Sequence, residues 1–582
     1  MNFKIIASKS GRSIHLSANG THNYIFGCFQ GFQRYCTQRK IKLKNFTNFF
    51  ITKKSDLISV SSNYLTHSEA ELEDLNVILN NKMIENEENF VQNLFCKNRQ
   101  CNILNSFEDE KIKVLNLYLD GYTNYLIEFK PIKGSFLVNK LDKNFPRDQI
   151  KRLKNGEKVT FDGKIFDGND YKKDDIYPKP VYILNSLPKN LNEMPFFDQI
   201  EVSSLIFCNN DKILKKIKKI NKDSFSIKNK QGIDFESIFL LSKMLRSISP
   251  NFQVPINRKC RILKKSELSD GCEMTFDKQK KVYNLYRKES LESTEDIIKN
   301  KMEKYNITFL GTGSGVPSKY RNVSSNLINF NKIKILVDTG EDTMNQIKRI
   351  DYNYKKTIEN LEFILITHHH EDHFFGVVEI LNAKFKSKSK NIVIFAPQKV
   401  ISFINFFIEE EKLKKFATII NISLNLFDKK IYNFGNKILE IEHCGVIHCK
   451  DSVGYAISLL KKDKKIKVSI SGDCRPSASF LKIAENSDFF IHEATFGDDL
   501  ADHAKKYNHS TMSEAIDIFR ESGSKNLILT HFSQRYPKGV DFLSTSRNIF
   551  LASDFLSINI NKENKINFGK VSELTESLNN LN

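Results

Sequence analysis

Short apolar runs separated by longer polar stretches recur along this chain. In its second half, the runs Ile335–Val337, Phe363–Ile366 and Leu527–Leu529 are too apolar for half-exposed strands, so they predict buried ones. Between the first two runs, Asp342–Ile350 has the spacing of apolar positions that is typical of a helix. Buried strands that alternate with helices predict an α/β fold built around open sheets.

The first half contains a similar unit. Tyr24–Phe26 and Asn48–Ile51 are short apolar runs, and Gln30–Leu43 between them is polar and basic with helical spacing. The parallel extends to a shared threonine, which is Thr52 in the first unit and Thr367 in the second. Self-similarity of this kind indicates an internal duplication.

The residues after the shared threonine differ completely between the two units. In the second, the run ends in His-x-His-x-Asp-His, with His368, His370, Asp372 and His373 in the four slots. Neutral imidazole nitrogens and carboxylate oxygens suit a divalent ion such as zinc. Because four ligands in so short a stretch are too many for one ion with open positions, two adjacent ions are indicated. The first unit has Lys53–Asp56 instead, so we interpret it as a half that has lost its metal site.

Other strand ends in the second half carry residues of the same kind. Short apolar runs precede Asp338, Asp473, Glu493 and His531, while His448 supplies a further imidazole. In an open α/β sheet, ligands bind at the edge where the carboxyl ends of the strands lie. We therefore expect these side chains to converge with the histidine cluster.

A glycine-rich loop follows the apolar run Ile307–Leu310. The glycines of Gly311–Gly315 invite comparison with a dinucleotide-binding motif, but Pro317 and a polar loop follow where that motif needs a helix. We therefore reject that interpretation. The loop instead presents two cations, a ring and an amide, which suit the end of a nucleotide chain: Lys319, Arg321, Tyr320 and Asn322.

Length and charge extend this picture to the whole chain. At 582 residues the chain exceeds a single hydrophobic core, which predicts two domains. The net charge of +20 favours a polyanionic partner, with nucleic acid ahead of an anionic membrane surface and solubility as the alternative explanation. No apolar run reaches the length of a membrane span.

The cysteine pattern argues against a zinc finger. The 10 cysteines are scattered and include no Cys-x-x-Cys pair, so we expect reduced thiols in a cytosolic or nuclear compartment. The basic N-terminus could imitate a mitochondrial transit peptide, although Phe3–Ile6 already looks like a strand. The nucleus, the cytoplasm or both are the expected locations, with the mitochondrion as the alternative.

Composition divides the chain into segments. We expect one domain over residues 1–263, a charged linker over 264–304 that is poor in large apolar residues, and a second domain over 305–582. Within the first domain, residues 130–179 are net positive and rich in turn pairs such as Asn155-Gly156 and Asp162-Gly163. This excursion is either an arm that contacts phosphates or a plain solvated insertion, and both interpretations stay open at this level.

Together the motifs resemble the metallo-β-lactamase fold and, within it, ribonuclease Z, the tRNA 3′-processing endonuclease, in its long two-domain form. Four positions depart from the family pattern: Asp342 stands where glycine is usual, Glu371 where a small residue is usual, Ser452 where alanine is usual, and Phe145-Pro146 where the arm normally has Gly-Pro. The resemblance covers most of the chain, and its motifs occur in the family's order: Phe309–Ser314 with Pro317–Ser324, Asp338–Thr343, His448-Cys449, His492–Thr495, His509–Thr511 and His531–Tyr536.

The resemblance implies tandem αββα sandwiches, with a degenerate N-terminal half that carries a tRNA-binding arm within 130–179 and a catalytic C-terminal half. One zinc ion would bind to His368, His370 and His448, and a second to Asp372, His373 and His531, with Asp473 bridging them. Asp338 and Thr367 would support these ligands. The other implied residues act in catalysis (Asp372, Glu493 and His509) or bind the substrate (Lys319, Arg321, Asn322, Lys151, Arg152, Lys154 and Lys158).

The implied activity is zinc-dependent removal of the 3′ trailer from precursor tRNA, which leaves a 3′-hydroxyl on the tRNA and a 5′-phosphate on the trailer. Asp372 would orient or deprotonate the attacking water, and His509, held by Glu493, would protonate the leaving oxygen. Precursor tRNA is the expected partner, with no membrane partner and a monomeric chain. Two alternatives stay open: another dizinc hydrolase of the same superfamily, and a non-catalytic RNA-binding protein whose metals serve structure only.

Overall fold

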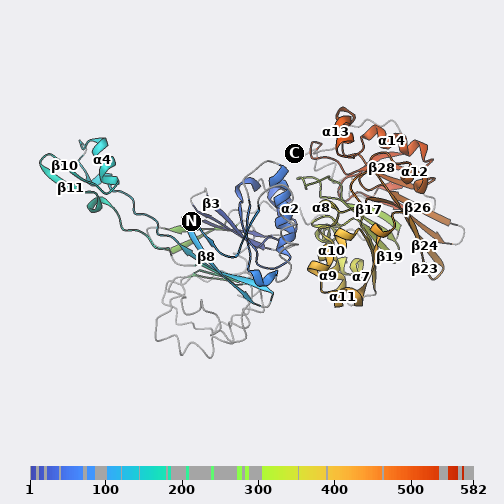
Figure 1. Cartoon of the computed structure of the whole chain (residues 1–582), viewed down its shortest axis with the longest axis horizontal. Helices are drawn as coiled ribbons and strands as arrows, with labels where there is room; N and C mark the ends of the chain where they lie inside the picture. Colours follow the sequence, from blue (N-terminus) through green and yellow to red (C-terminus); the bar gives the residue numbers. More distant parts are fainter. Residues whose placement is uncertain are drawn as a thin grey trace, which may run out of the picture.

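The computed structural model of the chain describes residues 2–7, 12–18, 22–38, 41–69, 75–84, 101–119, 121–142, 144–178, 181–184, 205–208, 237–240, 272–277, 282–287, 305–351, 353–387, 391–461, 464–536, 548–560 and 566–568. These residues form two halves, each built on two large β-sheets (Figure 1).

The first sheet of the C-terminal half has the strand order β22-β21-β20-β19-β18-β17-β30-β31, and β19 to β22 run parallel. Its strands are β17 Tyr305–Gly311, β18 Ser325–Phe330, β19 Ile333–Val337, β20 Leu361–Leu365, β21 Ile392–Ala396, β22 Ala417–Asn421, β30 Ser557–Ile560 and β31 Ile566–Phe568. The helices on its outer side are α6 Thr343–Ile350, α7 Tyr354–Glu359, α9 Val377–Lys386, α10 Gln398–Phe407 and α11 Glu410–Phe416.

The second sheet of this half has the order β23-β24-β25-β26-β27-β28-β29, and β26 to β29 run parallel. Its strands are β23 Asp428–Phe434, β24 Lys437–Gly445, β25 Val453–Lys461, β26 Lys464–Ile470, β27 Phe489–Glu493, β28 Leu527–Thr530 and β29 Ile549–Leu551. Helices α12 Ala478–Ala484 and α14 Met512–Glu521 pack on its outer face, and α13 Ala501–Lys506 precedes α14.

Alternation along the strands accounts for the layers. In β19, Ile335 and Val337 face the second sheet, whereas Leu336 faces the helices. A strand that is buried on both faces must be apolar throughout, which is why the runs at 335–337 and 363–366 contain no polar position. The predicted buried strands are confirmed, and the half is layered helix, sheet, sheet, helix.

The N-terminal half has one sheet of order β16-β15-β1-β2-β3-β4-β5-β6 and another of order β14-β13-β12-β9-β8-β7. Tyr24, Phe26, Phe50 and Tyr125 lie between the sheets, and the helices α1 and α2 cover the first sheet. The elements are β1 Asn2–Ala7, β2 Arg12–Ala18, β3 His22–Phe26, α1 Phe32–Gln38, β4 Asn48–Phe50, α2 Asp56–Glu69, β5 Leu75–Ile78, β6 Cys101–Leu104, β7 Phe107–Glu108, β8 Ile112–Leu119, β9 Tyr122–Phe129, β12 Val181–Leu184, β13 Leu205–Cys208, β14 Ser237–Leu240, β15 Cys272–Asp277 and β16 Val282–Arg287.

Part of the segment predicted as a charged linker belongs to this sheet. Strands β15 and β16, which lie within 264–304, pair with each other, and β15 pairs with β1. The linker prediction relied on overall charge and overlooked the alternation of Cys272, Met274 and Phe276, which is the spacing of a strand with one apolar face. The remainder of 264–304 lies outside the described residues.

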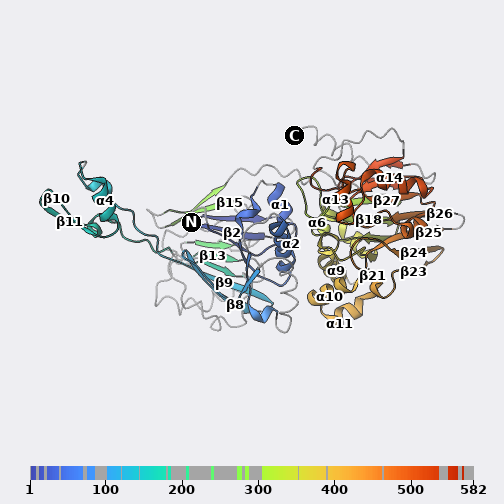
Figure 2. The same cartoon turned by 45° about the horizontal axis from the view of Figure 1, so that its top comes forward.

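The basic excursion forms an arm that projects from the N-terminal half, away from the C-terminal half (Figures 1 and 2). Two extended segments are bridged at Ile132–Ile176 and Phe136–Lys172. At the tip, Leu141, Phe145, Leu153 and Val159 form a small hydrophobic cluster. The tip consists of η3 Val138–Lys140, α4 Arg147–Lys154, the hairpin β10 Lys158–Phe161 and β11 Lys164–Asp167, and η4 Gly168–Tyr171.

Candidate active site

The predicted metal ligands meet at one edge of the C-terminal half. Strand β20 ends at Leu365, and the short helix α8 (Glu371–Phe374) starts immediately after His370, so the histidine cluster lies at the carboxyl end of a parallel strand. Strands β26, β27 and β28 bring Asp473, Glu493 and His531 to the same place. The expected convergence of strand ends is confirmed, because parallel strands of both sheets point the same way.

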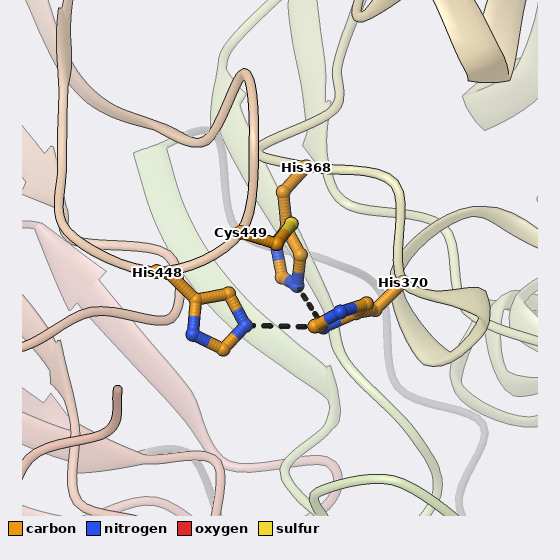
Figure 3. Close-up of side chains that lie close together, drawn as sticks. All are labelled: His368, His370, His448 and Cys449. Carbon is orange, nitrogen blue, oxygen red and sulfur yellow. Dashed lines mark hydrogen bonds between the residues drawn. The ribbon is translucent and has the colours of Figure 1, made fainter. Parts of the chain in front are cut away.

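Three histidines form the first cluster (Figure 3). Nδ1 of His370 lies 3.1 Å from Nε2 of His368 and 3.0 Å from Nε2 of His448. Cys449 lies beside these rings, with its Sγ 3.2 Å from the Ser452 hydroxyl. Sequence reasoning had assigned no role to this thiol.

The second cluster contains two histidines and a carboxylate. Nε2 of His531 lies 3.2 Å from Nε2 of His373 and 3.2 Å from Oδ2 of Asp372, and the last two atoms are 3.5 Å apart. Asp473 lies between the clusters, since its Oδ2 is 3.3 Å from Nε2 of His373 and 3.7 Å from Nε2 of His368. All seven predicted ligands are therefore close together.

This donor set fits metal ions. Burial lowers the pKa of His370 to about 3, so its ring is neutral and can offer a nitrogen lone pair to a metal ion. Zinc–nitrogen bonds of about 2.0–2.1 Å place two nitrogens on one ion about 3.3 Å apart, close to the separations in both clusters. The donor set is therefore one that can hold metal ions.

Outer groups fix the orientation of the rings. Oδ2 of Asp338 lies 2.7 Å from Nδ1 of His373, and its Oδ1 accepts the Thr367 amide at 2.8 Å. The Thr367 hydroxyl lies 3.0 Å from Nδ1 of His368. A carboxylate or hydroxyl behind a ligating histidine sets the ring orientation and raises the basicity of the ligand nitrogen. The structure thus places Asp338 and Thr367 behind the ligands, where the resemblance implied them.

Two supports were missed by sequence reasoning. The carbonyl oxygen of Asn508 lies 2.9 Å from Nδ1 of His448, and the Thr495 hydroxyl lies 3.0 Å from Nδ1 of His531. The first is a backbone carbonyl, which every residue type has, so the sequence cannot indicate it. Thr495 belongs to the family-like motif His492–Thr495, but its contact with His531 joins residues 36 positions apart in the chain.

Beside the metal ligands, Glu493 and His509 form a pair. Oε1 of Glu493 lies 2.8 Å from Nδ1 of His509, and the carboxylate also accepts the Thr495 hydroxyl at 2.7 Å. Burial by itself lowers the pKa of His509, but the carboxylates of Glu493, Asp473 and Asp372 together outweigh it, Glu493 most strongly, and raise that pKa to about 9. His509 therefore holds a proton at neutral pH in an otherwise desolvated site, as a general acid must.

The loop between β17 and β18 approaches the metal ligands. The Gly315 amide donates to Oδ2 of Asp372 at 2.8 Å. Of the three predicted substrate contacts in this loop, Lys319 is exposed, whereas Arg321 and Asn322 are 7% and 1% exposed. Arg321 donates to the Thr312 hydroxyl at 2.7 Å, and the side chain of Asn322 donates to the Glu341 carbonyl at 2.8 Å. The geometry gives these two residues a role inside the fold, and their contact with a substrate stays a prediction.

The predicted arm residues lie far from the metal ligands, at the opposite end of the molecule in Figures 1 and 2. All four are exposed: Lys151, Arg152, Lys154 and Lys158. Arg152 is paired with Glu157 at 2.8 Å, and Lys158 with Asp167 at 3.4 Å. A substrate that contacts both the arm and the metal site must therefore be large.

Known proteins share the sequence of the C-terminal half. The family model described as anti-Pycsar protein Apyc1 matches residues 305–548. A ribonuclease Z of Listeria monocytogenes is 30% identical over 297 residues, which cover 42% of this chain and 94% of that protein. The chain belongs to the ribonuclease Z family. All of the predicted metal ligands lie within the part that the family model matches.

Longer proteins of the ribonuclease Z family are also similar. The mitochondrial ribonuclease Z of Drosophila melanogaster is 34% identical over 245 residues, which cover 40% of this chain, and the chain spans about a third, 32%, of that relative's length. A crystal structure of a long form RNase Z from yeast has a TM-score of 0.71 at 19% identity, covering 100% of this chain and 98% of that one. At this identity the likeness shows the fold, and the predicted tandem metallo-β-lactamase architecture is confirmed. Among the described helices, none has the length and apolarity to span a membrane.

Proposed function

We propose that this protein is a zinc-dependent endoribonuclease that removes the 3′ trailer from precursor tRNA, leaving a 3′-hydroxyl on the tRNA and a 5′-phosphate on the trailer. The observation that carries this proposal is the presence of Glu493 and a protonated His509 directly beside two clusters of metal ligands. A site that only stabilised the fold would need no proton donor. Relatives named ribonuclease Z support the same reading.

Two zinc ions would occupy the site. His368, His370 and His448 would hold one, and Asp372, His373 and His531 the other, with Asp473 between them. Bound zinc would supply Lewis acidity, which polarises the scissile phosphate and lowers the pKa of water. The protein holds the ligand rings in place through Asp338, Thr367, Thr495 and the Asn508 carbonyl.

Three side chains manage the protons. Asp372, which accepts the Gly315 amide, orients the attacking water or takes its proton. His509 donates a proton to the ribose 3′-oxygen as it leaves, and Glu493 keeps His509 protonated before that step. A positioned general acid of this kind contributes roughly 10²–10⁴-fold to the rate.

The substrate would contact both halves. Lys319 lies on the surface of the active-site loop, which Arg321 and Asn322 hold, and would contact the acceptor end of the tRNA. Lys151, Arg152, Lys154 and Lys158 at the arm tip would contact backbone phosphates, an interaction that weakens with salt. In this proposal the degenerate half with its arm grips the tRNA, the C-terminal half cuts it, and one chain acts alone in the nucleus, the cytoplasm or both, or in the mitochondrion.

The test is to incubate the purified full chain with a 3′-extended precursor tRNA and to map the ends of the products. We expect cleavage near the junction with the trailer and the end groups given above. Loss of cleavage in Asp372→Ala and after chelation would support the metal site. No cleavage, or cleavage that survives both treatments, would refute the proposal.

The same assay separates the two alternatives. Another dizinc hydrolase would leave precursor tRNA intact yet hydrolyse a small phosphodiester, a thioester or a lactam. A non-catalytic RNA-binding protein would retain the RNA and hydrolyse none of these substrates.

A further inference from the structure

A buried ion pair joins the N-terminal half, whose described residues contain no candidate group of metal ligands and which is called the metal-free half below, to the C-terminal half, called the catalytic half. Arg34, on α1 of the N-terminal half, is 4% exposed, and its Nη2 donates to Oδ2 of Asp554 at 3.1 Å. Asp554 lies between β29 and β30 of the catalytic half and is 3% exposed. An ion pair this deeply buried interacts strongly, because water does not screen it.

Asp554 also accepts hydrogen bonds from both ends of the active-site loop, residues 312–322 between β17 and β18. Its Oδ1 accepts the amide and the hydroxyl of Thr312 at 3.1 and 2.9 Å. Its Oδ2 accepts the amide of Asn322 at 2.7 Å and the side chain of Gln346 at 3.0 Å. One carboxylate therefore closes the loop that leaves β17 and returns to β18.

Other residues of this loop contact the candidate metal ligands or their chain neighbours. The Gly315 amide donates to the metal-ligand candidate Asp372 at 2.8 Å. The Ser314 amide donates to the carbonyl of Phe532, and the Phe532 amide donates to the carbonyl of Thr312, at 3.0 and 2.9 Å. Phe532 follows the ligand candidate His531 directly. A shift of the loop would thus move groups that hold two ligands.

If Arg34 served only to fill space in the core, an apolar side chain would be more favourable than a guanidinium group. Among the described residues, its Nε and Nη1 are buried and have no hydrogen-bond partner. A buried N–H without a partner destabilises a fold, and an apolar side chain of similar length would avoid that penalty. What Arg34 supplies is a positive charge in direct contact with Asp554. Burial raises the pKa of Asp554, and the Arg34 charge opposes that rise.

We propose that Arg34 of the metal-free half is a positioning residue for the active site of the other half, and that it acts through Asp554 on the loop 312–322. If Asp554 took up a proton, an O–H would oppose donors that already point at its oxygens, and the loop would move. The metal-free half therefore does more than carry the arm. This inference rests on the proposed phosphodiester hydrolysis, but not on the identity of the RNA substrate.

The test compares three variants of the zinc-loaded full chain. Arg34→Met removes the charge at similar length, and Arg34→Lys keeps the charge. Lys54→Met is the matched control, because Lys54 is another cation that contacts the other half, with its Nζ 3.8 Å from the centroid of the Phe406 ring. The steady-state hydrolysis of bis(p-nitrophenyl) phosphate and the zinc content are measured for each.

We expect Arg34→Met to lower kcat about tenfold with an unchanged KM, since the reacting groups are displaced while binding of a small substrate is not. Arg34→Lys should restore most of the rate, and Lys54→Met should stay within about twofold of the unaltered chain. Equal losses in Arg34→Met and Lys54→Met, or no loss in either, would overturn the proposal.

Amide hydrogen exchange gives a readout that needs no activity. In Arg34→Met, exchange should speed up in peptides covering 311–323 and not in Lys54→Met; unchanged exchange there would overturn the proposal even if the rate fell. If Arg34→Met does not fold, Asp554→Asn is measured in the same way, with the same two outcomes. A chain that hydrolyses the small diester and loses rate in Arg34→Met but never cuts precursor tRNA would refute the proposed function and leave this inference standing.

Discussion

The two halves make the same hydrogen bonds at corresponding strand ends, but the residues that follow those strands differ. In the catalytic half, the Asp338 amide donates to the Leu365 carbonyl, and the Tyr455 hydroxyl donates to the Ile366 carbonyl, at 2.8 and 3.0 Å. In the other half, the Gly27 amide donates to the Phe50 carbonyl, and the Tyr125 hydroxyl donates to the Ile51 carbonyl, at 2.9 and 2.5 Å. The same contacts at corresponding positions support the internal duplication that the sequence pattern indicated.

The difference lies in the carboxylate behind the shared threonine. Thr367 is held by Asp338, whose other oxygen reaches His373. Gly27 stands where Asp338 stands, so Thr52 is held instead by Asp56, at 2.9 Å from its amide and 2.6 Å from its hydroxyl. Asp56 starts the 14-residue helix α2, whereas the corresponding helix α8 has four residues. The metal-free half thus replaces a ligand loop with the first turn of a helix.

Residues of the metal-free half that correspond to active-site positions of the catalytic half now lie at the contact between the halves. Ile58 stands where the catalytic half has His373, and it packs in a cluster of catalytic-half residues that includes Ile347 and Phe403. Gly31 and Asp342 occupy corresponding positions in the two halves and both have a positive φ, of 83° and 68°. They also meet, since a Cβ on Gly31 would lie 2.5 Å from Oδ1 of Asp342. The aspartate that departs from the family's glycine is accommodated by a glycine opposite it.

The largest expected effect comes from substituting corresponding residues in the two halves. His368→Ala should remove one ligand of the buried cluster and lower the rate of precursor tRNA cleavage by roughly 10³-fold or more, with loss of bound zinc. Lys53→Ala, at the corresponding position of the other half, should change neither. Metal analysis and single-turnover cleavage measure both. A comparable loss of zinc in Lys53→Ala would contradict the assignment of a single metal-binding half.

A second effect concerns the proton donor, which the metal-free half lacks in its described residues. Glu493→Gln removes the charge that raises the pKa of His509, so that pKa should fall from about 9. Because a general acid must be protonated, kcat of the unaltered chain should decline as the pH rises through that pKa. In the variant this decline should begin at lower pH, with a rate at pH 8 lower by about 10²-fold. An unshifted pH profile would exclude Glu493 as the group that tunes His509.

The third prediction tests the arm against the catalytic half. Lys151, Arg152 and Lys154 on α4, all exposed, are replaced together by alanine, and the control replaces the exposed Lys412, Lys414 and Lys415 on α11. The arm variant should raise KM for precursor tRNA about tenfold and weaken its salt dependence, because it loses phosphate contacts. Hydrolysis of a small diester should be unchanged. Equal effects of the two triple variants would indicate that only net charge matters.

The smallest effect concerns the pH dependence of stability at the contact between the halves. Oε1 of Glu341 accepts the Gly31 amide at 2.9 Å, and burial, with a contribution from Asp342, raises the pKa of Glu341 to about 7. The folded state then binds a proton more tightly than the unfolded chain, so stability should fall as the pH rises from about 4.5 to about 7. Glu341→Gln, which copies Gln30 at the corresponding position, should remove this fall and gain up to about 3 kcal/mol at pH 8. Denaturation at pH 5 and pH 8 measures the free energy of unfolding of the variant and of the unaltered chain. An equal difference between the two proteins at both pH values would refute a proton-linked effect.

Much of the site could be read from residues close together in sequence. The cluster at 368–373 and the strand ends before Asp338, Asp473 and His531 are local patterns, and a buried strand followed by a ligand is recognisable without a partner. The position of the arm followed from turn pairs and charge. By contrast, the linker prediction failed in part because the residues of β15 alternate between apolar and polar or charged types, and composition averages over that alternation.

The sequence by itself determined which residues end the buried strands, that only one of two similar units carries the His-x-His-x-Asp-His pattern, and that a basic, turn-rich excursion interrupts the other. The tertiary structure decided what Asn322 and Arg34 do, because each bonds to a buried carboxylate, Asp554, that lies more than 200 residues away. Arg321 likewise donates to a distant acceptor, the Ala552 carbonyl, at 2.7 Å. Periodicity records whether a position is buried. It does not record which distant charge will be buried with it, and that pairing is settled only when the sheets of the two halves pack.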